Sequence, residues 1–332
     1  MGPRTSDWLF KEVSRNGEVD VTLADELITM LPNVRCVKIA PEYHANSWRY
    51  AASTESFMQK IFHHCTRLKH IYLSGIHDPQ FERIMKDTCR FLQILEIAAL
   101  LADTYTQTKP ENPRTAAFTT LRIQSVFTFS DNLYALQHLL LWPIRLERFA
   151  LHTINNRRGP YMPITMLEPF KHCLSEIELY PRDPDRTPFS FSDFSKLETL
   201  RLTWTNVKES SVLEAPWHLL PPRLRTLGWV FTGVDAGDDP EEVWEVFHLI
   251  VEVWTRKLVQ AALAKDIPLR EVEMIFFPNL VLEFAPTHHE YPWDQIKRLE
   301  EKLIGDGVCV VYDTPSITKE EWLTHGSNTP SP

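Results

Sequence analysis

Glycine is scarce in this chain, with 10 residues among 332. Nucleotide-binding loops need closely spaced glycines so that the backbone can approach a phosphate, and neither a dinucleotide fingerprint nor a P-loop occurs. No serine lies in the Gly-x-Ser-x-Gly turn that carries the nucleophile of many hydrolases. The sequence therefore lacks the usual motifs of nucleotide-dependent enzymes and serine hydrolases, and we expect no catalytic residue and no cofactor.

Cysteines and long apolar runs are also few. The five cysteines are odd in number and unevenly spaced, which favours small buried side chains over a disulfide framework. We therefore expect a reducing compartment, cytoplasmic or nuclear. The longest apolar stretches, such as residues 97–102 and 136–142, fall far short of the roughly 20 residues that a membrane-spanning helix needs. We therefore expect no membrane span.

Basic charge is in deficit, since the formal net charge is −9 and the isoelectric point is about 5.8. Nucleic acids and anionic membranes are bound by clustered Lys and Arg, so this balance argues against both as partners. Hydrophobic residues make up 43% and charged residues 24% of the chain, which suffices for a core and a solvated surface. The composition is that of a globular protein.

What the chain does contain is a repeated pattern: an apolar residue, two variable residues, an apolar residue, one variable residue and an apolar residue. It occurs, with one more apolar position upstream, at Leu31, Val34, Val37 and Ile39; at Cys65, Leu68, Ile71 and Leu73; at Cys89, Leu92, Leu95 and Ile97; and at Phe194, Leu197, Leu200 and Leu202. This spacing is typical of a short strand that feeds a solenoid core.

The spacing of the repeats defines the expected architecture. The first apolar residues of the strand pattern, used as markers, are Val34, Leu68, Leu92, Phe118, Leu146, Leu174, Leu197, Leu224 and Leu269. Six of their eight intervals are 23 to 28 residues long, within the period of leucine-rich repeats. We predict an α/β leucine-rich-repeat solenoid, a horseshoe of nine to ten irregular repeats, with a concave parallel sheet and convex helices or irregular turns. Each strand should start near its marker.

The expected organisation has three parts. Residues 1–30 would form an N-terminal cap, 31–312 the solenoid, and 313–332 a largely disordered tail that is rich in Ser, Thr and Pro. The sequence Asp239-Pro240-Glu241-Glu242 predicts the start of a long helical insertion, about 239–264, between the last two markers. A closing helix over 294–304 and a strand over 308–312 should follow.

Two Leu-Pro runs carry a family resemblance: Leu31-Pro32-Asn33-Val34 and Leu220-Pro221-Pro222-Arg223-Leu224. With these runs, residues 31–312 resemble the leucine-rich-repeat portion of fungal F-box-like proteins. The resemblance implies a substrate-recognition subunit of a ubiquitin ligase that docks on the cullin adaptor. Only thirty residues precede Leu31, fewer than the three helices of an F-box need, so no residue here is expected to perform the docking. The alternative is an interaction scaffold unconnected to ubiquitination.

Side chains alternate along a strand, so the variable positions of the pattern should point out of the core. This outward face should bind a protein or peptide partner through charged and aromatic groups. Its expected binding residues are Lys38, His70, Tyr72, Glu96, Arg122, Arg148, Glu178, Tyr180, Arg201 and Glu273.

Two polar loops offer a third, enzymatic interpretation. One is Pro181 to Pro188, which contains Asp183 and Asp185; the other is His288-His289-Glu290 between two prolines. The second loop lacks the His-x-x-x-His spacing that places two imidazoles on one helical face, so we expect no metal site. An enzyme using either loop would need a deep polar pocket beside it.

Overall fold

The computed structural model describes residues 8–9, 30, 32–39, 60–73, 76–77, 91–101, 114–127, 134–155, 164–180, 190–203, 212, 215–231, 247–276, 290–314 and 318–327. The chain divides into two compact units, residues 1–170 and 171–332.

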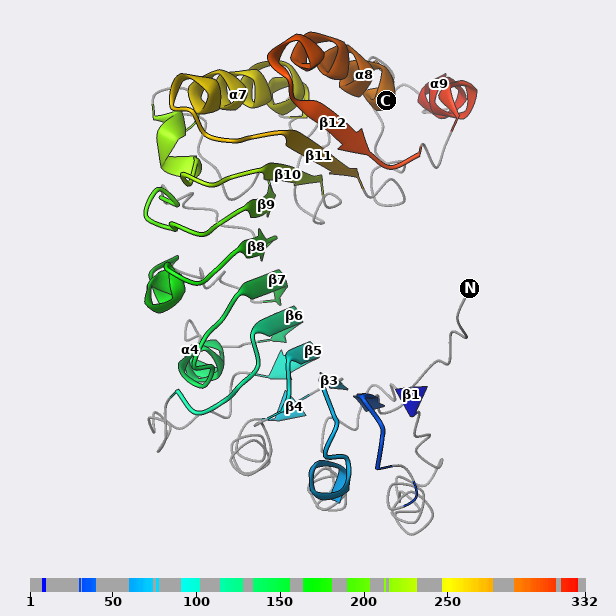
Figure 1. Ribbon diagram of the computed structural model, residues 1–332. Coiled ribbons are helices and arrows are strands. Elements are labelled where there is room, and N and C mark those ends of the chain that lie inside the picture. Colours follow the sequence, from blue (N-terminus) through cyan, green and yellow to red (C-terminus); the bar gives the residue numbers. More distant parts are fainter. Residues whose placement is uncertain are drawn as a thin grey trace. The chain divides into compact units, whose positions relative to one another are not determined.

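Unit 1 is built on parallel strands that follow one another mostly in chain order (Figure 1). The order is β1-β2-β3-β5-β6-β7, and β4 also pairs with β5. The elements are β1 Trp8–Leu9, β2 Cys36–Ile39, β3 His70–Leu73, β4 Ile76–His77, β5 Ile94–Leu101, β6 Thr120–Phe127, α4 Tyr134–Leu141, β7 Arg148–Asn155 and the 3₁₀ segment η1 Ile164–Phe170.

Unit 2 continues the same principle, with the strand order β8-β9-β10-β11-β12 and parallel pairing between neighbours. Its elements are β8 Glu176–Leu179, β9 Thr199–Thr203, the 3₁₀ segment η3 Pro216–Leu219, β10 Thr226–Phe231, the π-helical turn η4 Ile250–Trp254, α7 Thr255–Ala264, β11 Glu271–Phe276, α8 Pro292–Leu303, the 3₁₀ turn η7 Ile304–Asp306, β12 Cys309–Tyr312 and α9 Lys319–Ser327.

The predicted strands are confirmed in position and direction. All nine markers are followed, two residues later, by the first residue of a strand, from Cys36 after Val34 to Glu271 after Leu269. Strands that pair in parallel cannot be joined by a tight hairpin, so each marker interval must return the chain to the same end of the sheet. The α/β class with a parallel sheet follows from this arrangement.

Alternating burial explains why the strands form at these residues. Along β3 and β8, half-buried and buried residues alternate, and each strand contains two residues of each kind. The pairing register places the buried residues in line: Ile71, Leu95, Leu121 and Phe149 in unit 1, and Ile177, Leu200, Leu227 and Val272 in unit 2. All eight are at most 1% exposed. Removing each such side chain from water stabilises the fold by about 1.5–3 kcal/mol.

The predicted insertion forms a helix over 247–264, while residues 239–246 lie outside the described residues. Phe247 packs on Phe231 of β10 with ring centroids 4.8 Å apart, and Trp254 packs near Trp229 at 6.2 Å. Thr255 donates its hydroxyl to the Ile250 carbonyl at 2.8 Å, within the π-helical turn. The apolar stripe of this helix therefore covers the buried face of β10.

The C-terminal part agrees with the expectation up to Tyr312 and differs beyond it. Helix α8 and strand β12 lie where predicted, but residues 319–327 form α9 instead of belonging to a disordered tail. Thr318 and Glu321 make a capping box, with each side chain bonded to the other's backbone N–H. Trp322 is 3% exposed and lies 6.3 Å from the Tyr291 ring. This burial and the cap stabilise α9.

In the parts of the chain that the structure describes, no helix is long and apolar enough to cross a bilayer.

Candidate functional site

The outward side chains of the strands form one polar face in each unit, which we call the strand face. The pairing register aligns Lys38, Tyr72, Glu96 and Arg122 in unit 1, and Glu178, Arg201, Gly228 and Glu273 in unit 2. We call each alignment the middle row of its unit. The predicted outward positions are thus confirmed as neighbours across adjacent strands, and the predicted Tyr180 follows β8 directly.

Arg201 is the centre of the strand face in unit 2. Its Nη1 donates to Glu176 Oε1 and to Glu178 Oε1, both at 2.6 Å. Its Nε and Nη2 donate to the two oxygens of Glu273 at 2.5 and 2.9 Å, in a bidentate pair. We call these four residues the Arg201 cluster.

The Arg201 cluster is partly shielded from water, since the Arg201 side chain is 19% exposed and those of Glu178 and Glu273 are 17% exposed. The hydrogen bonds to Glu273 raise the pKa of the Arg201 guanidinium against the opposing effect of its burial. Three carboxylates and one guanidinium leave the cluster a formal charge of −2. The result is a fixed acidic surface.

Gly228 makes the long reach of Arg201 possible. Arg201 lies on β9 and Glu273 on β11, so their side chains meet over the strand between them, β10. A Cβ atom on Gly228 would lie 2.7 Å from Arg201 Cγ and 3.2 Å from Glu273 Oε2. Because such contacts are too short for carbon, the middle row of β10 needs glycine for the guanidinium to cross.

Tyr180 borders the cluster. Its hydroxyl donates to Glu178 Oε2 at 3.5 Å, a weak hydrogen bond. Burial, followed by the charge of Glu178, raises the pKa of the phenol well above its ordinary value. Tyr180 therefore stays neutral and presents a donor to the carboxylates.

The strand face of unit 1 is arranged differently. His70 Nε2 lies 3.1 Å from Glu96 Oε2, and this hydrogen bond lowers the pKa of the Glu96 carboxyl against the effect of its burial. Lys38 Nζ lies over the Tyr72 ring, 4.6 Å from its centroid. Arg122 and Arg148 are exposed. With neutral histidines, Lys38, Arg122 and Arg148 against Glu96 give this set a formal charge of +2.

The structure thus brings the predicted residues into separate groups. Arg201 joins Glu178 and Glu273, while Glu96 joins His70. Sequence reasoning missed Gly228 and Glu271 as members of the face. The signal was present, because both occupy outward positions of the repeat pattern, Gly228 between Leu227 and Trp229 and Glu271 between Arg270 and Val272. Thr226 donates its hydroxyl to Glu271 at 3.4 Å.

The two loops of the enzymatic interpretation lie outside the described residues, except for Glu290. The Glu290 carboxylate pairs with Arg298, whose Nη2 donates to Oε2 at 2.6 Å and lowers the pKa of the carboxyl. Across the described ranges, no group of three or more His, Cys, Asp or Glu side chains is arranged to hold a metal ion.

Comparison with protein-family models and with curated proteins found no match for this chain.

Proposed function

We propose that this protein is a non-enzymatic recognition module of the leucine-rich-repeat type, which binds a partner protein through its strand faces. The observation that carries the proposal is the Arg201 cluster. Four charged side chains are held in place by short hydrogen bonds and retain a net negative charge. Groups that are already ordered lose little conformational entropy on binding, so such a face favours association.

The chemistry of unit 2 selects a basic partner segment. The acidic set includes Glu271, which lies on the same face beside Thr226, so the negative charge extends past the cluster. Complementary Lys and Arg side chains on a partner would be steered to this face and would fix the register of binding. Tyr180 adds an aromatic side chain at the border of the charged set.

The repeat architecture supports the leucine-rich-repeat assignment. Strands that begin two residues after an apolar marker, pair in parallel and recur mostly every 23 to 28 residues are typical of this family. In the version implied by the resemblance to fungal F-box-like proteins, the partner is a substrate presented to a cullin-based ubiquitin ligase. An interaction scaffold outside ubiquitination is the alternative.

Affinity capture with a matched pair of variants tests the proposal. Glu271→Lys reverses one charge on the strand face, whereas Glu301→Lys makes the same change at an exposed position of α8. Partners captured by the unmodified chain, quantified by mass spectrometry, should fall at least about fivefold with Glu271→Lys and remain with Glu301→Lys. Equal recovery with both variants, and with Arg122→Glu on unit 1, would overturn binding through the strand faces.

The same capture separates the two versions of the function. Cullin and its adaptor, recovered together with the partner, would support a role in a ubiquitin ligase. A stable partner without them would replace that role with a scaffold.

A further inference from the structure

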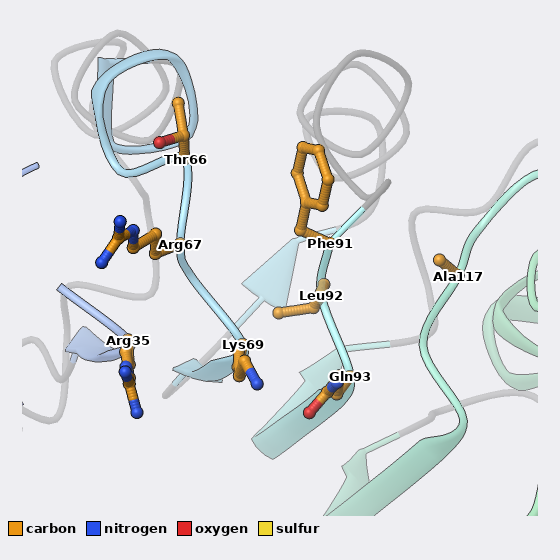
Figure 2. A pocket seen from close by; sticks show the side chains of 8 residues that line it. All are labelled: Arg35, Thr66, Arg67, Lys69, Phe91, Leu92, Gln93 and Ala117. Carbon is orange, nitrogen blue, oxygen red and sulfur yellow. The ribbon is translucent and has the colours of Figure 1, made fainter. Parts of the chain in front are cut away.

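A second surface of unit 1 lies away from the strand face, at the ends where the strands begin. An open groove of about 490 Å³ crosses the residues that precede β2, β3, β5 and β6. Its labelled side chains come from four successive strand starts (Figure 2). The lining includes three cations, Arg35, Arg67 and Lys69, and no carboxylate.

The groove has two rows of side chains that the sheet register places. Arg35, Lys69 and Gln93 each come one residue before a strand, and their backbones are joined by hydrogen bonds from Lys69 N–H to the Arg35 carbonyl and from Gln93 N–H to the Lys69 carbonyl, both 2.8 Å. Arg67, Phe91 and Ala117 each come three residues before a strand. The first row is cationic at β2 and β3 and uncharged at β5, and the second is cationic at β3 and uncharged at β5 and β6.

The three cations carry no ion pair with any residue that the structure describes, in a chain whose net charge is −9. Like charges that are brought together without a counter-charge repel one another and attract an anionic ligand. The arrangement therefore favours carboxylates at the β2–β3 end of the groove.

Phe91 gives the other end of the groove an apolar character. Its side chain is 64% exposed, whereas the neighbouring Leu92 is buried beneath it in the core. Figure 2 shows Phe91 between the strand starts that carry Arg67 and Ala117. An exposed aromatic ring beside cations is typical of the anchor positions in protein interfaces.

We propose that this groove binds an acidic peptide segment of a partner protein, with its carboxylates on Arg35, Arg67 and Lys69 and an apolar side chain on Phe91. Neighbouring strands are about 4.8 Å apart, so the β2 start and the β5 start are separated by about 10 Å, or about three residues of extended chain. The preferred ligand has two adjacent acidic residues followed about three residues later by a large aliphatic or aromatic residue. This surface is independent of the proposed strand-face function.

Synthetic peptides test the groove directly. The probe is a fluorescein-labelled nine-residue peptide with two adjacent glutamates and a leucine three residues after them, and the control peptide has the same composition with the leucine ahead of the glutamates. We expect the probe peptide to bind the full chain at least about fivefold more tightly than the control peptide does, as measured by fluorescence anisotropy. Equal binding of both peptides, or no binding of either, would overturn the proposal.

Matched variants locate the binding site. Arg67→Glu and Lys69→Glu should each weaken binding of the probe peptide at least about tenfold, since each substitution places a carboxylate beside the carboxylates of the peptide. Arg223→Glu is the control, because Arg223 is also exposed and precedes strand β10 by three residues, as Arg67 precedes β3. Its effect should stay within about twofold. An equal loss in the Arg223 variant would overturn the assignment to this groove.

Phe91→Ala tests the apolar end and should weaken binding about fivefold, whereas Ile144→Ala should leave it unchanged. Ile144 is 63% exposed, so both substitutions remove an exposed apolar side chain without opening the core.

Competition tests the class of ligand. If a short single-stranded RNA displaces the labelled peptide more effectively than the same peptide without its label does, the ligand of the groove is a nucleic acid and the acidic-peptide proposal is overturned.

Discussion

The strand faces of the two units share one backbone plan and carry opposite charge. Each is a parallel sheet with outward residues aligned in a middle row. In unit 2 a single guanidinium joins three carboxylates from two strands, β8 and β11, and the cluster stays acidic. In unit 1 three cations are spread over three strands, and Glu96 is the one carboxylate among the described residues of that strand face.

This difference shows that the repeat fixes where outward side chains lie but not whether they bind one another. Unit 2 concentrates its charges because glycine occupies one place in the middle row and lets Arg201 reach across β10. In unit 1, Tyr72 takes a place between Lys38 and Glu96 in the middle row, and Lys38 lies over its ring. Ordered charges and dispersed charges should respond differently to substitution.

Removal of Arg201 should have the largest effect. Arg201→Met leaves three carboxylates close together without their cation, and we expect the free energy of unfolding to fall by about 2–3 kcal/mol, less than for a fully buried pair because the cluster is partly solvated. Urea denaturation followed by tryptophan fluorescence would measure it. The matched change on unit 1, Arg122→Met, should cost less than about 0.5 kcal/mol because Arg122 is exposed.

A further substitution checks the electrostatic cause. Adding Glu273→Gln to Arg201→Met removes one of the uncompensated carboxylates and should restore part of the lost stability. Equal losses for Arg201→Met and Arg122→Met would show that the two faces do not differ as described.

Gly228→Ala should have the second largest effect on the free energy of unfolding. Its Cβ would meet Arg201 Cγ at 2.7 Å, so the side chain must shift and its bonds to Glu273 weaken, with an expected cost of about 1–2 kcal/mol in the free energy of unfolding. Gly305→Ala is the control, since a Cβ there has no neighbour within 4 Å and should change stability by less than about 0.5 kcal/mol. An unchanged midpoint in the Gly228 variant would contradict the crossing of Arg201 over β10.

The contribution of Glu96 to the stability of unit 1 should depend on pH. Because His70 lowers the pKa of Glu96 from about 4.5, ionised Glu96 stabilises the folded state above that pH, and the contribution is lost as pH falls through the lowered value. We expect it to be below about 1 kcal/mol. The stability difference between the unmodified chain and Glu96→Gln should therefore shrink from about pH 6 to about pH 3. A constant difference would contradict the His70 contact; Glu301→Gln is the surface control.

The smallest effect is expected at Tyr180. Tyr180→Phe removes a weak hydrogen bond and should cost less than about 0.5 kcal/mol. Because the folded pKa of the phenol is raised, its contribution is intact below about pH 10 and is lost as pH rises further. Ultraviolet titration should show one fewer late-ionising tyrosine in the variant; an identical titration would contradict burial of Tyr180 beside Glu178.

Much of the fold follows from the spacing of apolar residues. The nine markers predicted the starts of nine strands because a residue such as Leu197 must enter the core just before Leu200 and Leu202 do. The two-residue strands β1 and β4 follow no marker and were not predicted. Outward positions followed from alternation alone. The Arg201 to Glu273 contact did not, since the pattern gives rows but not which long side chains in a row will meet.

Two features needed information that the repeat pattern does not contain. The role of Gly228 depends on the space above β10, which only the neighbouring strands define. Helix α9 was missed because the Ser, Thr and Pro composition around it suggested a tail, although Thr318 and Glu321 form a recognisable capping box. Its stability also depends on burial of Trp322, a tertiary effect.

The reach of Arg201 has a consequence for the order in which unit 2 assembles. Its partners Glu176 and Glu178 are 25 and 23 residues away in sequence, whereas Glu273 is 72 residues away. Contacts between distant residues carry a larger loop-closure cost and form late. We therefore expect loss of the Glu273 carboxylate to accelerate unfolding while leaving the folding rate nearly unchanged, so that this bond sets how long the native state survives rather than how fast it is reached.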